Sequence, residues 1–237
     1  MSANASGDRG RSASRRPVVT VAALYGAGGS VVGPRVAERL SVPLLDREIP
    51  EDVARRTGLS EEAVADVDEK PRSRMERLTE TLGRASNITG DAAGSNERPD
   101  LQEHQLRGYI EDSMARLSAS GGVAIGRGGM VVLAGVPGAL HVHLGGPRDA
   151  RIEQRMALEG IDRKTAKRRQ EAEDRARARY VRGAYGVDGG DPSLYHLMVD
   201  STALDLDTCV DLIVTASRAR TRQADTGSKD RRPDVQT

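Results

Sequence analysis

In Pro17-Val-Val-Thr-Val-Ala-Ala-Leu-Tyr-Gly-Ala-Gly-Gly-Ser-Val-Val-Gly33, an apolar run rich in β-branched residues breaks into glycines and continues as a helix pattern. Val32, Val36 and Leu40 recur at the spacing of one helix face. The loop Gly26–Ser30 leaves main-chain N–H groups uncovered at the positive end of that helix, which suits a phosphate group. Glycines also form ordinary turns, so the stretch predicts either a phosphate-binding loop or a structural turn.

This loop lacks the cation that phosphate loops usually carry. Measured against G-x-x-x-x-G-K-[ST], the register from Ala23 to Ser30 keeps the second glycine, Gly28, and the hydroxyl residue. Ala23 stands in place of the first glycine and Gly29 in place of the lysine. A charge for the phosphates must therefore come from elsewhere in the chain.

Length and composition allow one α/β domain or two small ones, with an aliphatic core. The chain has 237 residues, 37% of them hydrophobic, with 5 Tyr and no Phe or Trp. Cys209 is the single cysteine, which excludes an internal disulfide. The sequence has no long apolar segment for a membrane and no hydrophobic leader, so we expect a cytoplasmic protein without a membrane partner.

The two ends of the chain differ from its body. Residues 1–17 and 218–237 each carry a net charge of +3 and lack apolar periodicity, and the body between them is acidic. We therefore expect disordered tails at 1–16 and 218–237, around a folded domain at 17–217. No aromatic residues are interleaved with these arginines for base stacking, so we expect no specific nucleic-acid partner.

Strand-like and helix-like segments alternate along the body. Apolar runs at 42–45, 122–125, 140–144 and 197–199 are separated by helical patterns, one of them at 207–216. This alternation predicts a parallel sheet covered by helices on both faces. Ligands of such sheets bind outside the carboxyl ends of the strands, where Asp46 and Arg127 follow two of the runs. Arg127 is flanked by glycines, so its guanidinium could reach a phosphate unhindered, although it also fits a surface turn.

The segment 148–182 is strongly basic, with 12 Lys/Arg against 7 Asp/Glu. Such a run is either a solvated helix face or a mobile lid that closes over polyphosphate. Arg151 and Arg155 lie four residues apart and share a helix face. A cation cluster of this kind suits phosphoryl transfer, because the transition state spreads negative charge over several oxygens.

The order of these motifs resembles the cytidylate kinase-like family of P-loop nucleoside monophosphate kinases. The matching words are Tyr25-Gly-Ala-Gly-Gly29, Leu45-Asp-Arg-Glu-Ile49, Ile125-Gly-Arg-Gly128, His141-Val-His-Leu144, Asp174-Arg-Ala-Arg177 with Tyr180, and Asp191-Pro-Ser-Leu-Tyr195. The resemblance implies a three-layer P-loop NTPase fold with a parallel sheet. It also implies a helical acceptor-binding insertion at about 50–120 and a lid at about 148–182.

The resemblance further implies the role of each site residue. The donor, ATP with Mg²⁺, would be held by the loop residues Gly26, Ala27, Gly28, Gly29 and Ser30, with Arg155 and Arg175. The acceptor, a nucleoside monophosphate of the CMP or dCMP type, would meet Asp46 and Arg127. Arg151 and Arg177 would be the catalytic lid arginines. No protein ligand for a metal is implied.

The chain departs from the family at the loop, which leaves two functions open. Members commonly carry Ser-Arg-Glu-Tyr before the glycines and Arg after them, where this chain has Ala22, Ala23, Leu24 and Ser30. Either a lid arginine or Arg35 supplies the charge to a kinase, or the protein is a catalytically weak nucleotide-binding or regulatory relative. The sequence specifies neither the acceptor base nor the oligomeric state.

Two further residue types are open to more than one interpretation. His141 and His143 are spaced to share one face of a strand and could bind a metal, but no third ligand accompanies them, so core or rim histidines are the simpler interpretation. Cys209 lies in an apolar helix pattern and fits a small buried side chain.

Overall fold

The computed structural model describes residues 15–45 and 99–227. Asp46 and most of the predicted acceptor-binding insertion lie outside the described residues. Within the described part, no helix is both long enough and apolar enough to cross a membrane.

A five-stranded, all-parallel sheet forms the centre of the fold, as the alternating pattern predicted. Its strands stand in the order β2-β3-β1-β4-β5, so the glycine loop follows the central strand. The strands are β1 (Val18–Ala23), β2 (Leu44–Leu45), β3 (Gly122–Ile125), β4 (Leu140–Gly145) and β5 (Leu197–Asp200).

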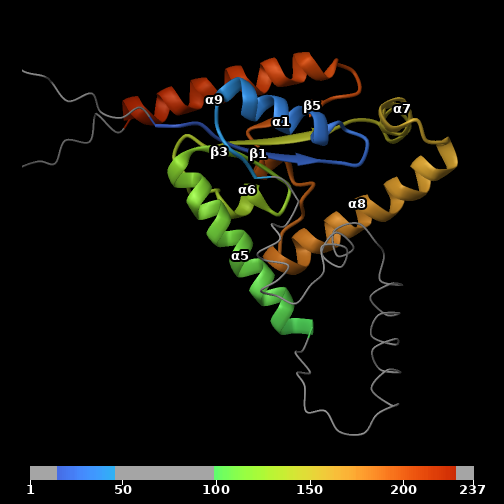
Figure 1. Ribbon diagram of the computed structural model, residues 1–237, viewed down its shortest axis with the longest axis horizontal. Helices are drawn as coiled ribbons and strands as arrows, with labels where there is room; N and C mark the ends of the chain where they lie inside the picture. The colour runs from blue at the N-terminus through green and yellow to red at the C-terminus, as the bar shows by residue number, and fades with distance from the viewer. Residues whose placement is uncertain (1–14, 46–98, 228–237) are drawn as a thin grey trace, which may run out of the picture.

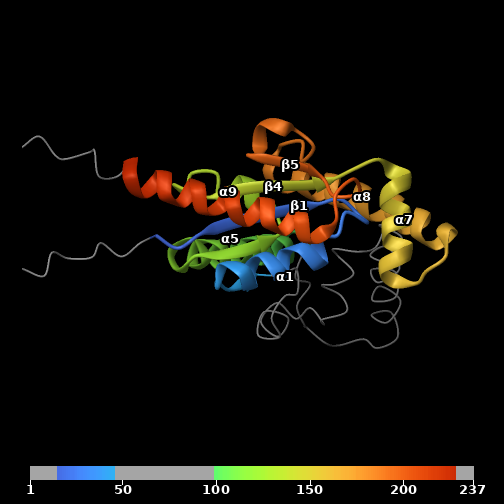
Figure 2. The ribbon, with the colours of Figure 1, turned by 90° about the horizontal axis from the view of Figure 1, so that it is seen from above.

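Helices cover both faces of this sheet, which gives the predicted three layers. Figure 1 shows α1 and α9 on one face and α5, α6 and α8 on the other, and Figure 2 shows α7 beyond the end of β4. The helices are α1 (Gly29–Leu40), α5 (Pro99–Ser120), α6 (Gly129–Val132), α7 (Arg148–Glu159), α8 (Arg163–Tyr185) and α9 (Leu206–Gly227), with a short 3₁₀ turn at Pro192–Leu194.

The core is aliphatic and lies mainly between the sheet and the α1/α9 layer. Val19, Val21 and Ala23 alternate along β1 toward that layer, and Val18 packs with α5 on the opposite face. Both faces of β1 are thus buried, which holds the carboxyl end of this strand firmly beneath the glycine loop.

The structure adds one boundary within the basic segment and moves the boundary at the C-terminal end. The basic segment is two helices, because Gly160 ends α7 in a left-handed conformation and the Asp162 side chain caps α8. The prediction of a disordered tail is wrong for residues 218–227, which continue α9. Thr221 is buried there, and Arg220 Nε donates to the Ala139 carbonyl 2.8 Å away, so tertiary contacts extend the helix.

Candidate functional site

The glycine loop is shaped for an anion. Gly26 and Gly28 have φ angles of 78° and 75°, a conformation that favours glycine, and Gly28 caps the start of α1. Within the described residues, the N–H groups of Gly26, Gly28, Gly29 and Ser30 donate to no acceptor. Unpaired amides at the N-terminus of a twelve-residue helix form the kind of site that binds phosphate.

Ala23 and Gly29, the two residues that depart from the usual phosphate-loop motif, lie next to each other. A Cβ atom added to Gly29 would lie 2.5 Å from the Cβ of Ala23, a distance too short for two carbon atoms. In G-x-x-x-x-G-K-[ST] the first position is glycine, so no methyl group competes with the side chain of the lysine. Here Ala23 carries the methyl group and Gly29 leaves the room for it.

Side chains from α7 and α8 hold the start of the loop. The main-chain N–H of Tyr25 donates to Asp174 Oδ1 at 2.9 Å, and Arg151 Nη1 donates to the Tyr25 carbonyl at 2.6 Å. Arg151 Nη1 also lies 3.0 Å from Asp174 Oδ2, which closes a ring around a single residue. Gln154 Nε2 donates to the Gly26 carbonyl at 3.0 Å. Arg151, predicted as a catalytic lid residue, is thus buried against the loop.

The segment after β5 also contacts the glycine loop. Ser201 Oγ, fully buried, donates to the Ala27 carbonyl at 2.8 Å. The side chain of Leu206 packs against Gly28, where an added Cβ would lie 2.7 Å from it. The sequence analysis missed Ser201 and Gln154. The position of Ser201 directly after a strand was the available signal, because this edge of a parallel sheet is where ligands bind.

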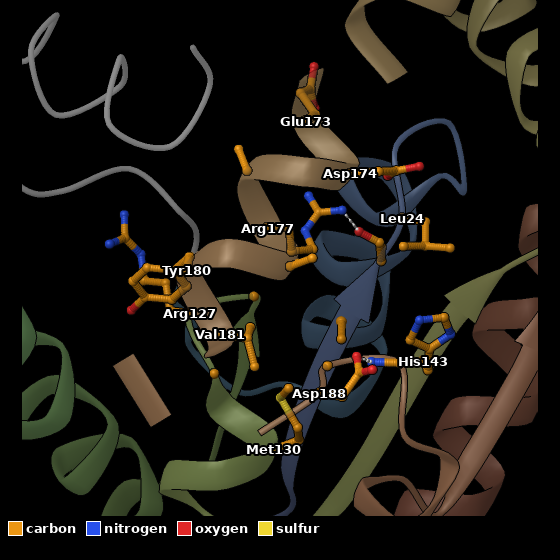
Figure 3. Close-up of a pocket in the computed structure, with 18 of the residues that line it drawn as sticks. Leu24, Arg127, Met130, His143, Glu173, Asp174, Arg177, Tyr180, Val181 and Asp188 are labelled. Atoms are coloured by element: carbon orange, nitrogen blue, oxygen red, sulfur yellow. Dashed lines mark hydrogen bonds between the residues drawn. The ribbon is translucent and has the colours of Figure 1, made fainter. Parts of the chain in front are cut away.

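A cavity of about 400 Å³ lies beside the loop, at the carboxyl ends of β1, β3 and β4. Figure 3 shows Arg127 and His143 on opposite sides of it, with Arg177 between them. Apolar side chains such as Met130 and Val181 form much of its wall. Its charged lining residues are Arg127 and Arg177 with the carboxylates Glu173, Asp174 and Asp188. A pocket with apolar walls and a few charged groups is suited to a small organic ligand that carries polar groups.

Arg127 lies just before α6 and has an unusual backbone conformation. Its φ is 53°, and the Tyr185 hydroxyl donates to its carbonyl at 3.1 Å. The adjacent Gly128 has no room for a side chain, because an added Cβ would lie 2.1 Å from the Tyr185 ring. A strained backbone fixed by its neighbours is typical of a functional position.

Arg177 connects this cavity with the loop. It lines the cavity from α8, and its Nη1 donates to the main-chain carbonyl of Ala23, as the dashed line in Figure 3 shows. Ala23 is the last residue of β1, directly before the loop segment. One guanidinium therefore lines the cavity and also binds the end of the strand that leads into the loop.

The side of the cavity opposite Arg127 contains His143 and Tyr195, with Asp188 nearby. Their rings meet edge to face with centroids 5.0 Å apart, and the Tyr195 hydroxyl donates to the Gly189 carbonyl at 2.6 Å. Burial, reinforced by the charges of Arg177 and Arg151, lowers the pKa of His143. Burial also raises the pKa of Tyr195 to about 12. Both rings are therefore neutral at physiological pH.

The remaining predicted site residues lie elsewhere. Arg155 stacks over the Tyr25 ring with its guanidinium carbon 5.0 Å from the centroid, and it pairs with Glu159. Arg175 is exposed on α8. Arg35 pairs with Asp207 of α9 at 2.5 Å and does not line the cavity. The roles of Arg155 and Arg175 in donor binding stay predictions.

His141 is a core histidine in this fold. Its Nδ1 lies 2.9 Å from Thr20 Oγ1, and its ring stacks on that of His196. Across residues 15–45 and 99–227, no three His, Cys, Asp or Glu side chains gather as metal ligands. Cys209 is buried and free.

A family model and solved structures match most of this chain. A family model described as the cytidylate kinase-like family matches residues 18–203. The crystal structure of an uncharacterized protein from Eubacterium ventriosum ATCC 27560 superimposes with a TM-score of 0.58 at 18% identity, over 86% of this chain and 99% of that one. A gluconokinase from Sinorhizobium meliloti 1021 gives a TM-score of 0.44 at 16% identity, over 92% and 99% of the two chains.

A curated relative matches a shorter region. The uronate isomerase of Corynebacterium glutamicum is 31% identical over 143 residues, which are 60% of this chain. That stretch is 27% of the relative, so the chain spans about a quarter of the length of the curated protein it matches.

Proposed function

The chain belongs to the cytidylate kinase-like family, and we propose that it transfers the γ-phosphoryl group of ATP to a nucleoside monophosphate of the CMP or dCMP type. The observation that carries this proposal is Arg177, which lines the cavity and donates to the carbonyl that precedes the loop. A cation between a donor site and an acceptor site is what phosphoryl transfer requires.

The donor is assigned to the glycine loop. The unpaired N–H groups from Gly28 to Ser30 would bind its phosphate oxygens, and the exposed Ser30 hydroxyl, which matches the [ST] position of the motif, would face Mg²⁺. Mg²⁺ neutralises charge on the β- and γ-phosphates when it is bound. The loop fits these groups because, among the described residues, its amides have no acceptor and its glycines place no side chain over them.

The acceptor is assigned to the cavity, with its phosphate on Arg127. In the transfer, an acceptor phosphate oxygen forms a bond to the γ-phosphorus as the bond to the ADP oxygen breaks. Arg177 would stabilise the charge that spreads over the equatorial oxygens. Asp46 would meet the acceptor sugar or base, but it lies outside the described residues.

A second function is favoured by the loop itself. No residue from Ala23 to Ser30 carries a positive charge, and Gly29 stands at the lysine position. A protein with this loop could bind nucleotide and transfer its phosphoryl group poorly, as a regulatory member of the same fold.

An ADP-release assay with ATP, Mg²⁺ and a panel of acceptors separates these functions. The panel contains CMP, dCMP, UMP, AMP and GMP, together with a uronate, since the curated relative is named as a uronate isomerase. The kinase proposal expects turnover with a pyrimidine monophosphate above the rate with water. Nucleotide affinity by calorimetry without turnover on any acceptor would support the regulatory function instead.

A further inference from the structure

Asp174 and Arg151 bind a single residue of the chain, Tyr25, from two sides. Tyr25 is the first residue after β1 and Leu24, directly before the glycines. Its N–H donates to Asp174 Oδ1 at 2.9 Å and its carbonyl accepts from Arg151 Nη1 at 2.6 Å. The two side chains are themselves paired at 3.0 Å, so the three groups form a closed ring.

Most of this ring is buried, and Asp174 also lines the cavity. The side chains of Arg151 and Asp174 are 7% and 24% exposed, and Tyr25 is buried. Arg151 Nε is also occupied, because it donates to the Gly146 carbonyl at 3.1 Å. Charge-assisted hydrogen bonds in such surroundings are strong and directional. Both oxygens of Asp174 are occupied within the ring.

We propose that Asp174 and Arg151 are positioning residues that fix the entry to the phosphate loop and thereby set the affinity for the donor nucleotide. They act through the main chain of Tyr25 and touch no reacting atom. Arg177, on the same helix as Asp174, lines the cavity together with it, whereas Arg151 does not. Helices α7 and α8 thus shape the donor site by holding the main chain of Tyr25, which leads into the loop.

The geometry of the next residue supports this assignment. Gly26 has a φ of 78°, and an added Cβ would lie 2.1 Å from the carbonyl oxygen of Arg151. Gln154, one turn further along α7, donates to the Gly26 carbonyl. The backbone of α7 is therefore pressed directly against the loop, and a change in the Arg151 side chain shifts both residues that open the loop.

The test uses the full chain and a matched control pair. Arg148 Nη2 and Glu171 Oε1, 2.5 Å apart, also join α7 to α8, but neither residue contacts the loop. Asp174→Ala should speed hydrogen exchange of the Tyr25 amide and raise the Kd for ATP on the order of 10- to 100-fold, because charged hydrogen bonds are lost. Glu171→Ala should change neither quantity.

A conservative variant separates positioning from folding. Asp174→Ala leaves Arg151 buried without its carboxylate, which can destabilise the whole fold. Asp174→Asn keeps an oxygen for the Tyr25 N–H, so we expect slow exchange of that amide and an ATP affinity between those of the wild type and Asp174→Ala. Because Asp174 also lines the cavity, its variants can change the KM for the acceptor too, so the Kd for ATP measured without acceptor is the quantity that tests the donor site.

The part of this inference that concerns ATP affinity rests on the proposed function, and different results would contradict each of the two. If the wild type binds no ATP, the proposed function is wrong, and exchange of the Tyr25 amide still tests the ring. Exchange in Asp174→Ala at the wild-type rate would overturn the inference. Faster exchange with unchanged ATP affinity would overturn the link between the ring and the donor.

Discussion

Ala23 and Gly29 determine which side chains the loop tolerates. Because a Cβ on Gly29 would lie 2.5 Å from the Ala23 methyl carbon, Gly29→Lys overpacks a buried site. We expect this variant to lose about 1–3 kcal/mol of unfolding free energy and to gain no transfer activity. Chemical unfolding and the ADP-release assay measure the two effects.

The double variant Ala23→Gly/Gly29→Lys is the control for this prediction. It restores the usual small residue opposite the lysine, so it should be more stable than Gly29→Lys alone, although glycine in a strand costs roughly 0.5–1 kcal/mol. If the two lysine variants are equally stable, Ala23 does not exclude a side chain at position 29. Activity gained by Gly29→Lys alone would support the view that the natural protein is a nucleotide-binding relative with a lost cation.

Arg127 is the residue whose change should affect the acceptor alone. Arg127→Ala removes a planar fork of donors from the cavity, so the KM for the monophosphate should rise by at least tenfold while the KM for ATP changes little. Steady-state kinetics with each substrate varied in turn gives both constants. Arg39→Ala, on an exposed arginine that pairs with Asp211 and does not line the cavity, is the matched control. Equal effects of Arg127→Ala on both substrates would place Arg127 outside the acceptor site.

At the scale of residues, the sequence predicted which side chains lie at the carboxyl edge of the sheet, but not which groups each one contacts. The carboxyl-edge rule placed Arg127 and the loop at one edge of the sheet, and the structure brings them there. Arg151 and Arg177 have similar neighbours in the sequence, yet one is buried against Tyr25 and the other lines the cavity. That difference depends on the packing of α7 and α8, which local patterns do not contain.

At the scale of elements, we propose that α8 carries the cation that replaces the loop lysine. Arg177→Ala should lower kcat on the order of 100-fold with little change in ATP affinity, because its contact strengthens as charge develops during transfer. Arg179→Ala, an exposed arginine two residues further along α8, controls for loss of charge on the helix. A rise in the Kd for ATP with unchanged kcat would assign Arg177 to ground-state binding.

Strand β4 carries a buried histidine that makes stability depend on pH. Burial, with nearby His196 and Arg220, lowers the pKa of His141 from 6.5 to about 4. The unfolded chain therefore binds a proton near pH 6.5 that the folded chain takes up only near pH 4. Stability is fully present above pH 6.5 and falls as the pH drops toward 4, by on the order of 3 kcal/mol.

His141→Gln tests this dependence, since glutamine has no proton to gain. Urea unfolding at a series of pH values should show a smaller loss of stability for His141→Gln than for the wild type between pH 6.5 and 4. Parallel profiles would mean that other groups cause the acid sensitivity.

The elements themselves were predicted well where periodicity was strong and poorly at their ends. The strand, loop and helix of residues 17–40 were confirmed because glycines and β-branched residues leave few alternatives. The end of α9 was missed because its last turns resemble a polar tail in composition and are stabilised by contacts with the loop before β4. Composition alone does not record such tertiary contacts.

At the scale of the whole molecule, the glycine loop joins the central strand to α1 and contacts α7, α8 and the segment after β5. Ligand binding to this loop should therefore stabilise the entire fold. At an ATP concentration 100 times its Kd, mass action adds about 2.7 kcal/mol to the free energy of unfolding. Thermal unfolding of the wild type with ATP and Mg²⁺ should show this shift.

Gly28→Val should abolish that stabilisation by ATP. Valine at a φ of 75° is strained, and its Cβ would lie 2.7 Å from Leu206, so the loop must deform and its amides must move. Gly160→Val is the matched control, because Gly160 has a φ of 66° with no atom within 4 Å and lies at the far end of α7. Both variants lose intrinsic stability to backbone strain, but only Gly28→Val should lose the ATP-dependent shift. A shift of wild-type size in Gly28→Val would mean that the loop is only a turn and that nucleotide, if bound, is held elsewhere.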